Sequence, residues 1–160
     1  MMQPPEQGAD ETRFRQATRY DLPAIIGLIA DDGLGRGRDD ASLPLDASYV
    51  NAFNAMEADG NQVMMVGELR GEVVAYLQIT FIPGLSRKGA WRGQIESVRV
   101  ACQLRGLGIG GRLLDHAVGL CRARGCRLVQ LTSDKTRAEA HRFYGRLGFV
   151  ASHDGFKLVL

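Results

Sequence analysis

Residues 98–114 read VRVACQLRGLGIGGRLL, and this stretch decides the fold. Its first residues continue a β-rich run, and its last residues begin an apolar stripe with helical spacing. Between the two, Gly106, Gly108, Gly110 and Gly111 let backbone amides approach an anion at the positive end of the helix. The segment therefore predicts a strand, a glycine-rich loop that binds a phosphate or pyrophosphate, and a helix.

Strand and helix signals flank this unit on both sides. β-rich runs predict strands at residues 13–17, 62–69, 72–82, 94–100, 127–132, 149–152 and 156–160. Apolar residues at helical spacing predict helices that include residues 22–29, 49–56, 113–121 and 140–147, the last opened by a capping box of Thr136 and Glu139. This order predicts an α+β layer fold with a central, twisted, mixed and mostly antiparallel sheet of about seven strands, flanked by about four helices. Turns at Arg70-Gly71 and Asp154-Gly155 predict two hairpins.

Composition is that of one globular domain. The chain has 160 residues, of which 45% are hydrophobic and 24% charged. This is enough to bury a single hydrophobic core without stabilising disulfides or metal ions. Residues 1–12 are polar, carry no apolar region of a signal peptide, and are expected to form a disordered tail before a domain at residues 13–160. No later apolar run is long enough to span a bilayer, so no membrane partner is expected.

Charge and cysteine content narrow the function classes further. The net charge is +2 with basic and acidic residues interspersed, which argues against a nucleic-acid partner. Cys102, Cys121 and Cys126 are odd in number and lack a C-x-x-C spacing, which argues against a disulfide framework or a zinc site. We therefore expect a cytoplasmic protein without a metal.

The glycines fit two phosphate-binding patterns. Gly106-x-Gly108-x-x-Gly111 satisfies the dinucleotide-binding fingerprint, but that fold needs a series of βαβ units, whereas antiparallel hairpins precede and follow the motif here. The same stretch reads Arg105-x-x-Gly108-x-Gly110 between a Val-x-Val strand and a Leu-Leu helix, and so resembles the acetyl-CoA-binding motif of the GNAT superfamily of N-acetyltransferases. The segments RAEAHRFYGRLGF at 137–149 and RQATRYDL at 15–22 extend the resemblance over nearly all of the chain beyond Thr12.

The resemblance implies the GNAT fold, acetyl-CoA as co-substrate, and direct acetyl transfer to a primary amine. The amides of the loop would hold the CoA pyrophosphate, and the pantetheine arm would lie between the strands at 94–101 and 127–132. The cofactor-binding residues that it implies are Val98, Arg99, Val100, Arg105, Gly106, Leu107, Gly108, Ile109, Gly110, Gly111, Arg137 and Phe143. Arg137 stands where the family commonly has asparagine, so it either reaches a CoA phosphate or is an exposed arginine at the start of a helix.

Two residues are candidates for the acid–base chemistry. Tyr144, the tyrosine of the family's Phe-Tyr pair, would protonate the departing thiolate; the alternative is a core aromatic residue. Glu96, the only carboxylate in the strand that leads into the loop, would take the amine proton directly or through water. Its alternative is a structural carboxylate paired with Arg99, Arg92 or a backbone amide, and Asp134 is a weaker candidate for the base.

The acceptor is left open by the sequence. A small-molecule amine is expected, with Tyr49, Phe53 and Trp91 as candidate walls of its cleft. The first alternative is a non-catalytic acyl-CoA-binding or regulatory module on the same fold; a dinucleotide-dependent oxidoreductase is more distant. By analogy with the family, residues 156–160 are expected to pair in a homodimer.

Overall fold

The structure, a computed structural model, describes residues 11–33 and 37–160. Five strands in this part of the chain form one sheet in sequence order. They are β1 (Arg13–Gln16), β2 (Gln62–Leu69), β3 (Glu72–Ile82), β4 (Trp91–Val100) and β5 (Cys126–Leu131). Neighbouring strands are antiparallel except β4 and β5, which are parallel. The predicted mixed, mostly antiparallel sheet is confirmed.

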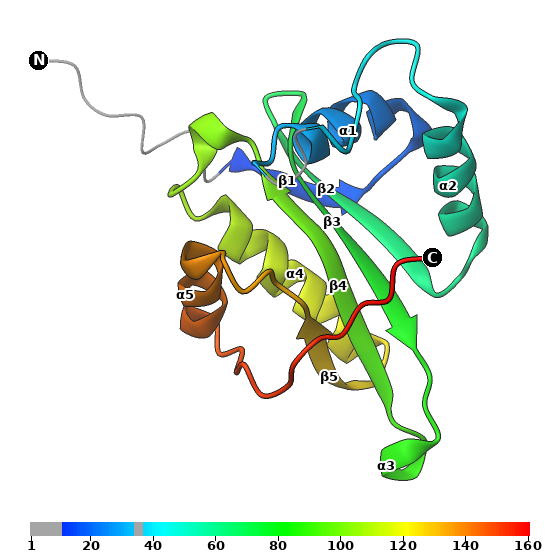
Figure 1. Ribbon diagram of the computed structural model, residues 1–160, viewed down its shortest axis with the longest axis vertical. Helices are drawn as coiled ribbons and strands as arrows, with labels where there is room; N and C mark the ends of the chain where they lie inside the picture. Colours follow the sequence, from blue (N-terminus) through cyan, green and yellow to red (C-terminus); the bar gives the residue numbers. More distant parts are fainter. Residues whose placement is uncertain (1–10, 34–36) are drawn as a thin grey trace, which may run out of the picture.

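Helices cover both faces of the sheet (Figure 1). One face carries α1 (Leu22–Ala30) and α2 (Ala47–Ala58), and the other carries α4 (Ile109–Ala123) and α5 (Ala138–Arg146). The short turn α3 (Ser86–Gly89) lies between β3 and β4, and the 3₁₀ turns η2 (Arg19–Asp21) and η3 (Cys102–Leu104) precede α1 and α4. The α+β fold is therefore confirmed, with α3 as an additional element.

The sheet separates two cores, because successive side chains of a strand point to opposite faces. The core under α4 contains Met65, Leu77, Ile79, Ile95, Leu113 and Leu114. The core under α1 and α2 contains Leu22, Ile25, Phe53, Met64, Val66 and Tyr76. Each such side chain contributes about 1.5–3 kcal/mol when it leaves water, so both helical layers are held mainly by these contacts.

β4 contains a bulge. Its pairing with β3 shifts between the pairs Gln78–Glu96 and Tyr76–Arg99, and within that interval β4 has one residue more than β3. Ser97 lies in the interval with a φ of 55°, in the left-handed region. Because a bulge bends a strand and re-aims its side chains, the direction of β4 changes at Ser97.

β4 and β5 diverge just before this bulge. Their parallel pairing runs from Trp91 opposite Cys126 to Ile95 opposite Leu131, where β5 ends, while β4 continues to Val100. Beyond Ile95, β4 therefore has no strand partner on this side in the described part of the chain. Backbone groups that no strand satisfies are available to side chains, water or a ligand.

The strands predicted at residues 149–152 and 156–160 are wrong. The chain has no regular secondary structure after Phe149. The Asp154-Gly155 turn signal is not sufficient to form these two strands, because an isolated two-stranded hairpin buries too little apolar surface to be stable in water. The exposed apolar side chains of this segment are Val150, Phe156, Leu158, Val159 and Leu160.

The predicted capping box of α5 is also wrong. Arg137 is the N-cap residue, and no side chain caps the helix. Thr136 instead donates from its backbone N–H (2.8 Å) and its hydroxyl (2.6 Å) to Asp134 Oδ1, an acceptor only two residues away. The loop between β5 and α5 is therefore shaped by Asp134, and the first turn of α5 has no side-chain acceptor over it.

Two predicted segments lie partly outside the described residues. These are residues 1–10 of the expected tail and residues 34–36 of the loop that follows α1. Thr12, at the end of the expected tail, is buried. No described helix has the length and apolar content needed to cross a membrane.

Asp21 ties β1 to the start of α1. Its carboxylate accepts from Arg15 Nη1 (2.7 Å) and Nη2 (2.9 Å), and from the backbone N–H (2.7 Å) and hydroxyl (3.0 Å) of Thr18. The Arg15 hydrogen bonds, followed by those from Thr18, lower the pKa of Asp21 to about 2 against the opposing effect of burial. Arg15 also donates to Glu68 of β2 at 2.8 Å, so one guanidinium joins three elements.

Replacement of Asp21 tests this junction through its pH dependence. Because the folded-state pKa lies below the unfolded value, the carboxylate stabilises the fold above about pH 4, and this contribution is lost as the pH falls towards 2. We expect Asp21→Asn to lower the free energy of unfolding at pH 7 by about 2 kcal/mol and to flatten its decline between about pH 4 and 2. Urea unfolding across this range measures both effects. The exposed Asp154→Asn should change neither, and an equal loss in both variants would contradict the assignment.

Gly93 marks a close approach between β4 and α4. A Cβ at this position would overlap the sulfur of the fully buried Cys121. We expect Gly93→Ala to cost about 1–3 kcal/mol of unfolding free energy through overpacking. Cys121→Ala should remove part of that cost in the double variant, because it removes the overlapping atom.

Gly119→Ala is the matched control for Gly93→Ala. Gly119 lies on α4 with nothing within 4 Å of an added Cβ, so its replacement should stabilise the helix by up to about 1 kcal/mol. Denaturant unfolding of the variants measures all of these values. Strictly additive losses at Gly93 and Cys121 would contradict the proposed overlap.

Candidate active site

The glycine-rich loop ends where α4 begins. Gly108 is the N-cap residue with a φ of 79°, and its carbonyl accepts from Arg112 N–H at 3.1 Å. Glycine adopts this left-handed conformation at little cost. The amides of Ile109, Gly110 and Gly111 form the first turn, whose N–H groups have no partner within the helix and form its positive end. The loop thus leads into the positive end of a helix, where the sequence predicts an anion-binding site.

Gly110 is the point at which α4, α5 and β4 meet. A Cβ on Gly110 would lie 3.4 Å from Phe143 Cζ and 3.4 Å from Val100 Cγ2. Arg105 donates from Nε to the Val100 carbonyl at 3.2 Å, which ties the loop to the end of β4. Val98 packs against the α4 core, as Val100 does. These predicted cofactor-binding residues therefore lie together, with Gly106 and Leu107 exposed in the loop between them and the helix.

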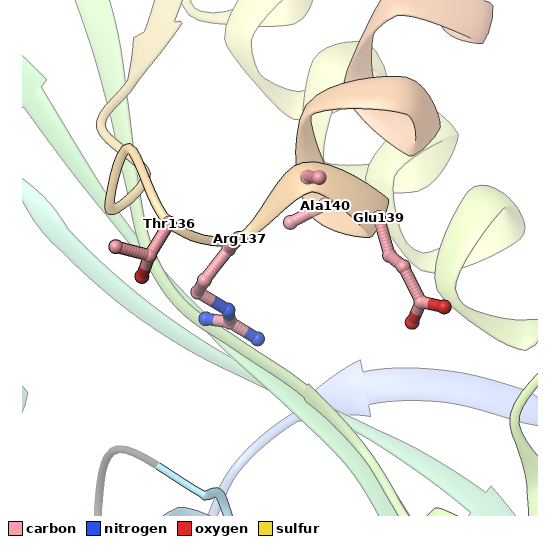
Figure 2. Close-up of a pocket in the computed structure, with 5 residues that line it drawn as sticks. Thr136, Arg137, Glu139 and Ala140 are labelled. Atoms are coloured by element: carbon pink, nitrogen blue, oxygen red, sulfur yellow. The ribbon is translucent and has the colours of Figure 1, made fainter.

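A cavity of about 340 Å³ lies at the start of α5. Its lining residues are Thr136, Arg137, Ala138, Glu139 and Ala140. Figure 2 shows the side chains of Arg137 and Glu139 leaving the first turn of α5 in different directions. The cavity is large enough for part of an extended ligand.

Tyr144 lies on α5 in a half-buried position. Its ring contacts Phe143 and Phe149, with centroid distances of 5.2 and 5.9 Å. Burial raises its pKa, and the guanidinium groups of Arg137 and Arg99 act in the opposite direction. The phenol is therefore protonated at neutral pH, and its hydroxyl makes no hydrogen bond to another residue within 11–33 or 37–160. It has the properties of a proton donor and also contributes its ring to the core.

Glu96 is exposed on β4, immediately before the bulge. Its negative charge adds to the effect of burial on Tyr76, whose pKa rises to about 12. The predicted alternative, a pairing with Arg99 or Arg92, is not found in the described part of the chain, since Arg99 pairs with Asp32 instead. The carboxylate of Glu96 is therefore accessible to a ligand.

A second cavity, of about 140 Å³, lies between α1, α2 and the sheet. It reaches Ser97 of the bulge and Gln78 opposite Glu96. The other lining residues are Leu22, Ile25, Ile26, Ile29, Tyr49, Ala52, Phe53, Met56, Met64 and Tyr76. Tyr49 and Phe53, which the sequence predicts as walls of the acceptor cleft, thus line this cavity. Trp91 does not, because it packs against the α4 core near the ring-stacking Arg124, at the other end of β4.

Asp32 was not predicted as a site residue. It is buried directly after α1 and pairs with Arg99 (3.2 Å) and Arg137 (3.6 Å). In the sequence, Asp31-Asp32-Gly33 is typical of the end of a helix. Nothing local distinguishes Asp32 from its exposed neighbour Asp31, because its partners come from β4 and α5.

Other reactive residues fit catalysis poorly. Burial raises the pKa of Cys121 to about 11, so its thiol is protonated at neutral pH. Hydrogen bonds from Thr136 lower the pKa of the exposed Asp134 carboxyl, which weakens it as a base. Within residues 11–33 and 37–160 no group of His, Cys, Asp or Glu side chains is arranged to hold a metal ion.

Known proteins are similar to this chain over most of its length. A sequence model of the acetyltransferase (GNAT) family matches residues 35–149. An aminoalkylphosphonate N-acetyltransferase of Salmonella typhimurium is 30% identical over 147 residues, which cover 92% of this chain and 90% of that protein. An L-methionine sulfoximine/L-methionine sulfone acetyltransferase of Pseudomonas paraeruginosa is 27% identical, over 87% of this chain and 80% of that protein.

A solved structure is more similar still. A transcriptional regulator from Bacillus halodurans C-125 has a TM-score of 0.92 and 44% sequence identity, over 94% of this chain and 100% of that chain. Its fold therefore follows this one over nearly the whole length of both chains.

Proposed function

Because the chain belongs to the GNAT acetyltransferase family, we propose that it transfers the acetyl group of acetyl-CoA directly to a primary amine of a small molecule. The observation that supports this best is the divergence of β4 from β5 beyond Ile95 and Leu131. In the described part of the chain, it leaves the end of β4 without a strand partner on the β5 side, next to Gly110 in the first turn of α4. A thioester-bearing arm along β4 and a pyrophosphate at α4 fit this arrangement.

The residues present fit CoA as a substrate. The first-turn amides of α4 from Ile109 to Gly111 would bind the pyrophosphate, with Arg105 and the residues from Gly106 to Gly108 forming the loop around it. The backbone from Val98 to Val100, which has no strand partner on the β5 side in the described part of the chain, would pair with the amides of the pantetheine arm, and Phe143 would pack beside it. Arg137 has two candidate roles, a CoA phosphate or a group of the acceptor. CoA supplies the activated acetyl group, and no metal is assigned a role.

The chemistry assigned to the side chains is a balanced proton transfer. The amine nitrogen forms a bond to the thioester carbonyl carbon, and the carbon–sulfur bond breaks. Glu96 takes the amine proton, directly or through water, and Tyr144 gives its phenol proton to the departing thiolate. The raised pKa of Tyr144 supports its role, because the acid must be protonated before the transfer.

A small acceptor is supported by the two enzymes described above, which are named for small molecules. The second cavity has room for an apolar part of such a molecule, next to Ser97 of the bulge. We assign the amine to the space between this cavity and Glu96.

Three further properties remain proposals. We propose a single catalytic domain over residues 13–160, which extends the family match at both ends. We propose a cytoplasmic location, on the basis of the cysteine pattern. We also propose a homodimer, for which the exposed apolar residues from Phe156 to Leu160 offer a contact surface.

The second candidate function is a regulatory module that binds acyl-CoA without catalysis. It is favoured by one observation, the name of the similar Bacillus halodurans protein as a transcriptional regulator. A module of this kind needs neither an accessible carboxylate at Glu96 nor a protonated phenol at Tyr144. The two functions are therefore separated by turnover.

Replacement of Tyr144 and Glu96 tests the enzymatic proposal. We expect Tyr144→Phe and Glu96→Gln each to lower kcat by about 10²-fold or more at neutral pH, because each removes one proton transfer. The KM for acetyl-CoA should change little. Thiol release from acetyl-CoA with a panel of amino sugars, polyamines, aminoalkylphosphonates, amino acids and aminoglycosides measures both constants.

The matched controls are Tyr20→Phe and Glu72→Gln, which make the same chemical changes at exposed positions. They should leave kcat unchanged. Binding of acetyl-CoA without turnover of any amine would favour the regulatory module. Turnover that survives in both site variants would contradict the assigned roles of Glu96 and Tyr144.

The glycine-rich loop is tested at Gly108. Valine at a φ of 79° is strained by about 1–3 kcal/mol and would shift the first turn of α4, so Gly108→Val should raise the Kd for CoA at least about tenfold. Gly71→Val places the same strain in the hairpin between β2 and β3, where φ is 83°. Calorimetric titration should show weaker CoA binding only for Gly108→Val. Equal binding by the two variants would contradict the assigned phosphate site.

A further inference from the structure

Three charged side chains from distant parts of the sequence meet beyond the bulge of β4. Asp32 follows α1, Arg99 lies on β4, and Arg137 caps α5. Arg99 Nη2 is 3.2 Å from Asp32 Oδ2, and Arg137 Nη2 is 3.6 Å from Asp32 Oδ1. One carboxylate thus faces two guanidinium groups, and this cluster carries an excess of one positive charge.

Two members of this cluster are largely removed from water. The side chains of Arg99 and Asp32 are 13% and 9% exposed. Burial lowers the pKa of Arg99; Asp32 opposes this effect, whereas Arg137 and Arg38 add to it. Arg38 is itself paired with Asp39 at 3.2 Å, so it brings its own counter-ion. The buried pair of Arg99 and Asp32 is neutral, so the excess positive charge of the cluster lies on the partly exposed Arg137, where a second anion can be bound.

Both guanidinium groups also have N–H donors that no residue in the described part of the chain accepts. Arg99 donates from Nη1 to the Val98 carbonyl at 2.9 Å, while its buried Nε has no hydrogen-bond partner. The Arg137 guanidinium donates no hydrogen bond within residues 11–33 and 37–160, since 3.6 Å to Asp32 is beyond hydrogen-bond reach. Its side chain is 37% exposed and so remains accessible. Carboxylates and phosphonates accept the paired N–H groups of a guanidinium well.

The cluster lies beside the proposed reacting groups. Both guanidinium groups act electrostatically on Tyr144. Arg137 lines the larger cavity, as Figure 2 shows. Arg99 is on the same strand as Glu96, just past the bulge. An anion bound by the two arginines is therefore within the length of a small molecule from both proton-transfer groups.

The anion could belong to the acceptor or to CoA. The face of the sheet to which Arg99 points distinguishes these two sources. Val98 and Val100 point to the α4 core, on the side of the glycine-rich loop. Arg99, between them in the strand, points the other way to Asp32 at the end of α1. That is the side of α1, α2 and the second cavity. The Arg99 side chain is thus directed away from the assigned pyrophosphate site.

We propose that the acceptor carries an acidic group close to its amine, a carboxylate or a phosphonate, and that Arg99 and Arg137 bind this group while Asp32 orients them. The inference rests on the proposed function, because it names the acceptor class of the same site. It also assigns Arg137 to the acceptor rather than to a CoA phosphate. Asp32 is a positioning residue, since it touches the arginines and not the substrate.

Matched acceptor pairs test the proposal in the full-length protein. Leucine is compared with leucinamide, and aminomethylphosphonate with methylamine, by thiol release from acetyl-CoA. We expect the acidic member of at least one pair to have the higher kcat/KM by about tenfold to hundredfold, the range for charge-assisted hydrogen bonds. Arg137→Gln and Arg99→Gln should remove this preference with the KM for acetyl-CoA unchanged. Arg146→Gln, an exposed arginine of the same helix, should retain it.

A binding measurement keeps the test independent of turnover and of the stability of the Arg99 variant. Inorganic phosphate is titrated calorimetrically into the protein saturated with CoA, which fills the CoA phosphate sites. Binding that is lost in Arg137→Gln, a substitution at a partly exposed position, supports the anion site even if no amine is acetylated. In that case the proposed catalysis fails and the anion site stands.

Three results would overturn the inference. The first is equal kcat/KM for the acidic and the uncharged member of every pair that turns over; acetyl transfer itself would then stand without an acidic acceptor. The second is an Arg137→Gln variant with a raised KM for acetyl-CoA and an unchanged acceptor preference, which would place Arg137 on the cofactor. Absence of phosphate binding to the CoA-saturated protein would contradict the anion site in the same way.

Discussion

The parting of β4 from β5 is the constraint on which the rest of the molecule depends. β5 ends at Leu131, while β4 continues past Ser97 with an extra residue that changes its direction. If β4 and β5 stayed paired along their whole length, β5 would satisfy the backbone groups on that side of β4 and leave no place for a ligand along it. Since the bulge also turns Arg99 towards α1, the same local irregularity shapes both sides of the sheet.

Most of the fold could be predicted from the sequence because its signals are local. The glycines between 106 and 111 mark the start of α4, and Arg70-Gly71 marks the hairpin of β2 and β3. The C-terminal hairpin shows the limit of this logic. Asp154-Gly155 is as good a turn signal as Arg70-Gly71, but the β2–β3 hairpin has helices on both faces, whereas residues from Phe149 onwards pack against too little of the protein.

The arrangement of the candidate site residues was predictable where a motif has a fixed geometry. Gly108, Gly110 and Phe143 lie together as the resemblance implies, because a left-handed cap and a close helix contact each require particular residues. Asp32 had no such signal, since its role depends on two arginines that are more than 60 residues away in the chain. Trp91 lies apart from Tyr49 and Phe53 for a different reason. The strand begins at Trp91 rather than at residue 94, which places the ring beside the α4 core.

The separation of the two cores has a consequence for how this enzyme scaffold can evolve. Residues that line the second cavity lie with α1 and α2, and those assigned to CoA lie with α4 and α5 on the opposite face of the sheet. Substitutions in separate cores share few neighbours, so their effects on stability are close to additive. A lineage can therefore exchange side chains around Phe53 and Tyr49, where the acceptor is proposed to lie, without repacking the helices assigned to CoA. Asp32 is the exception, because its ion pairs connect the end of α1 to both β4 and α5. A substitution of Asp32 would therefore affect both faces of the sheet.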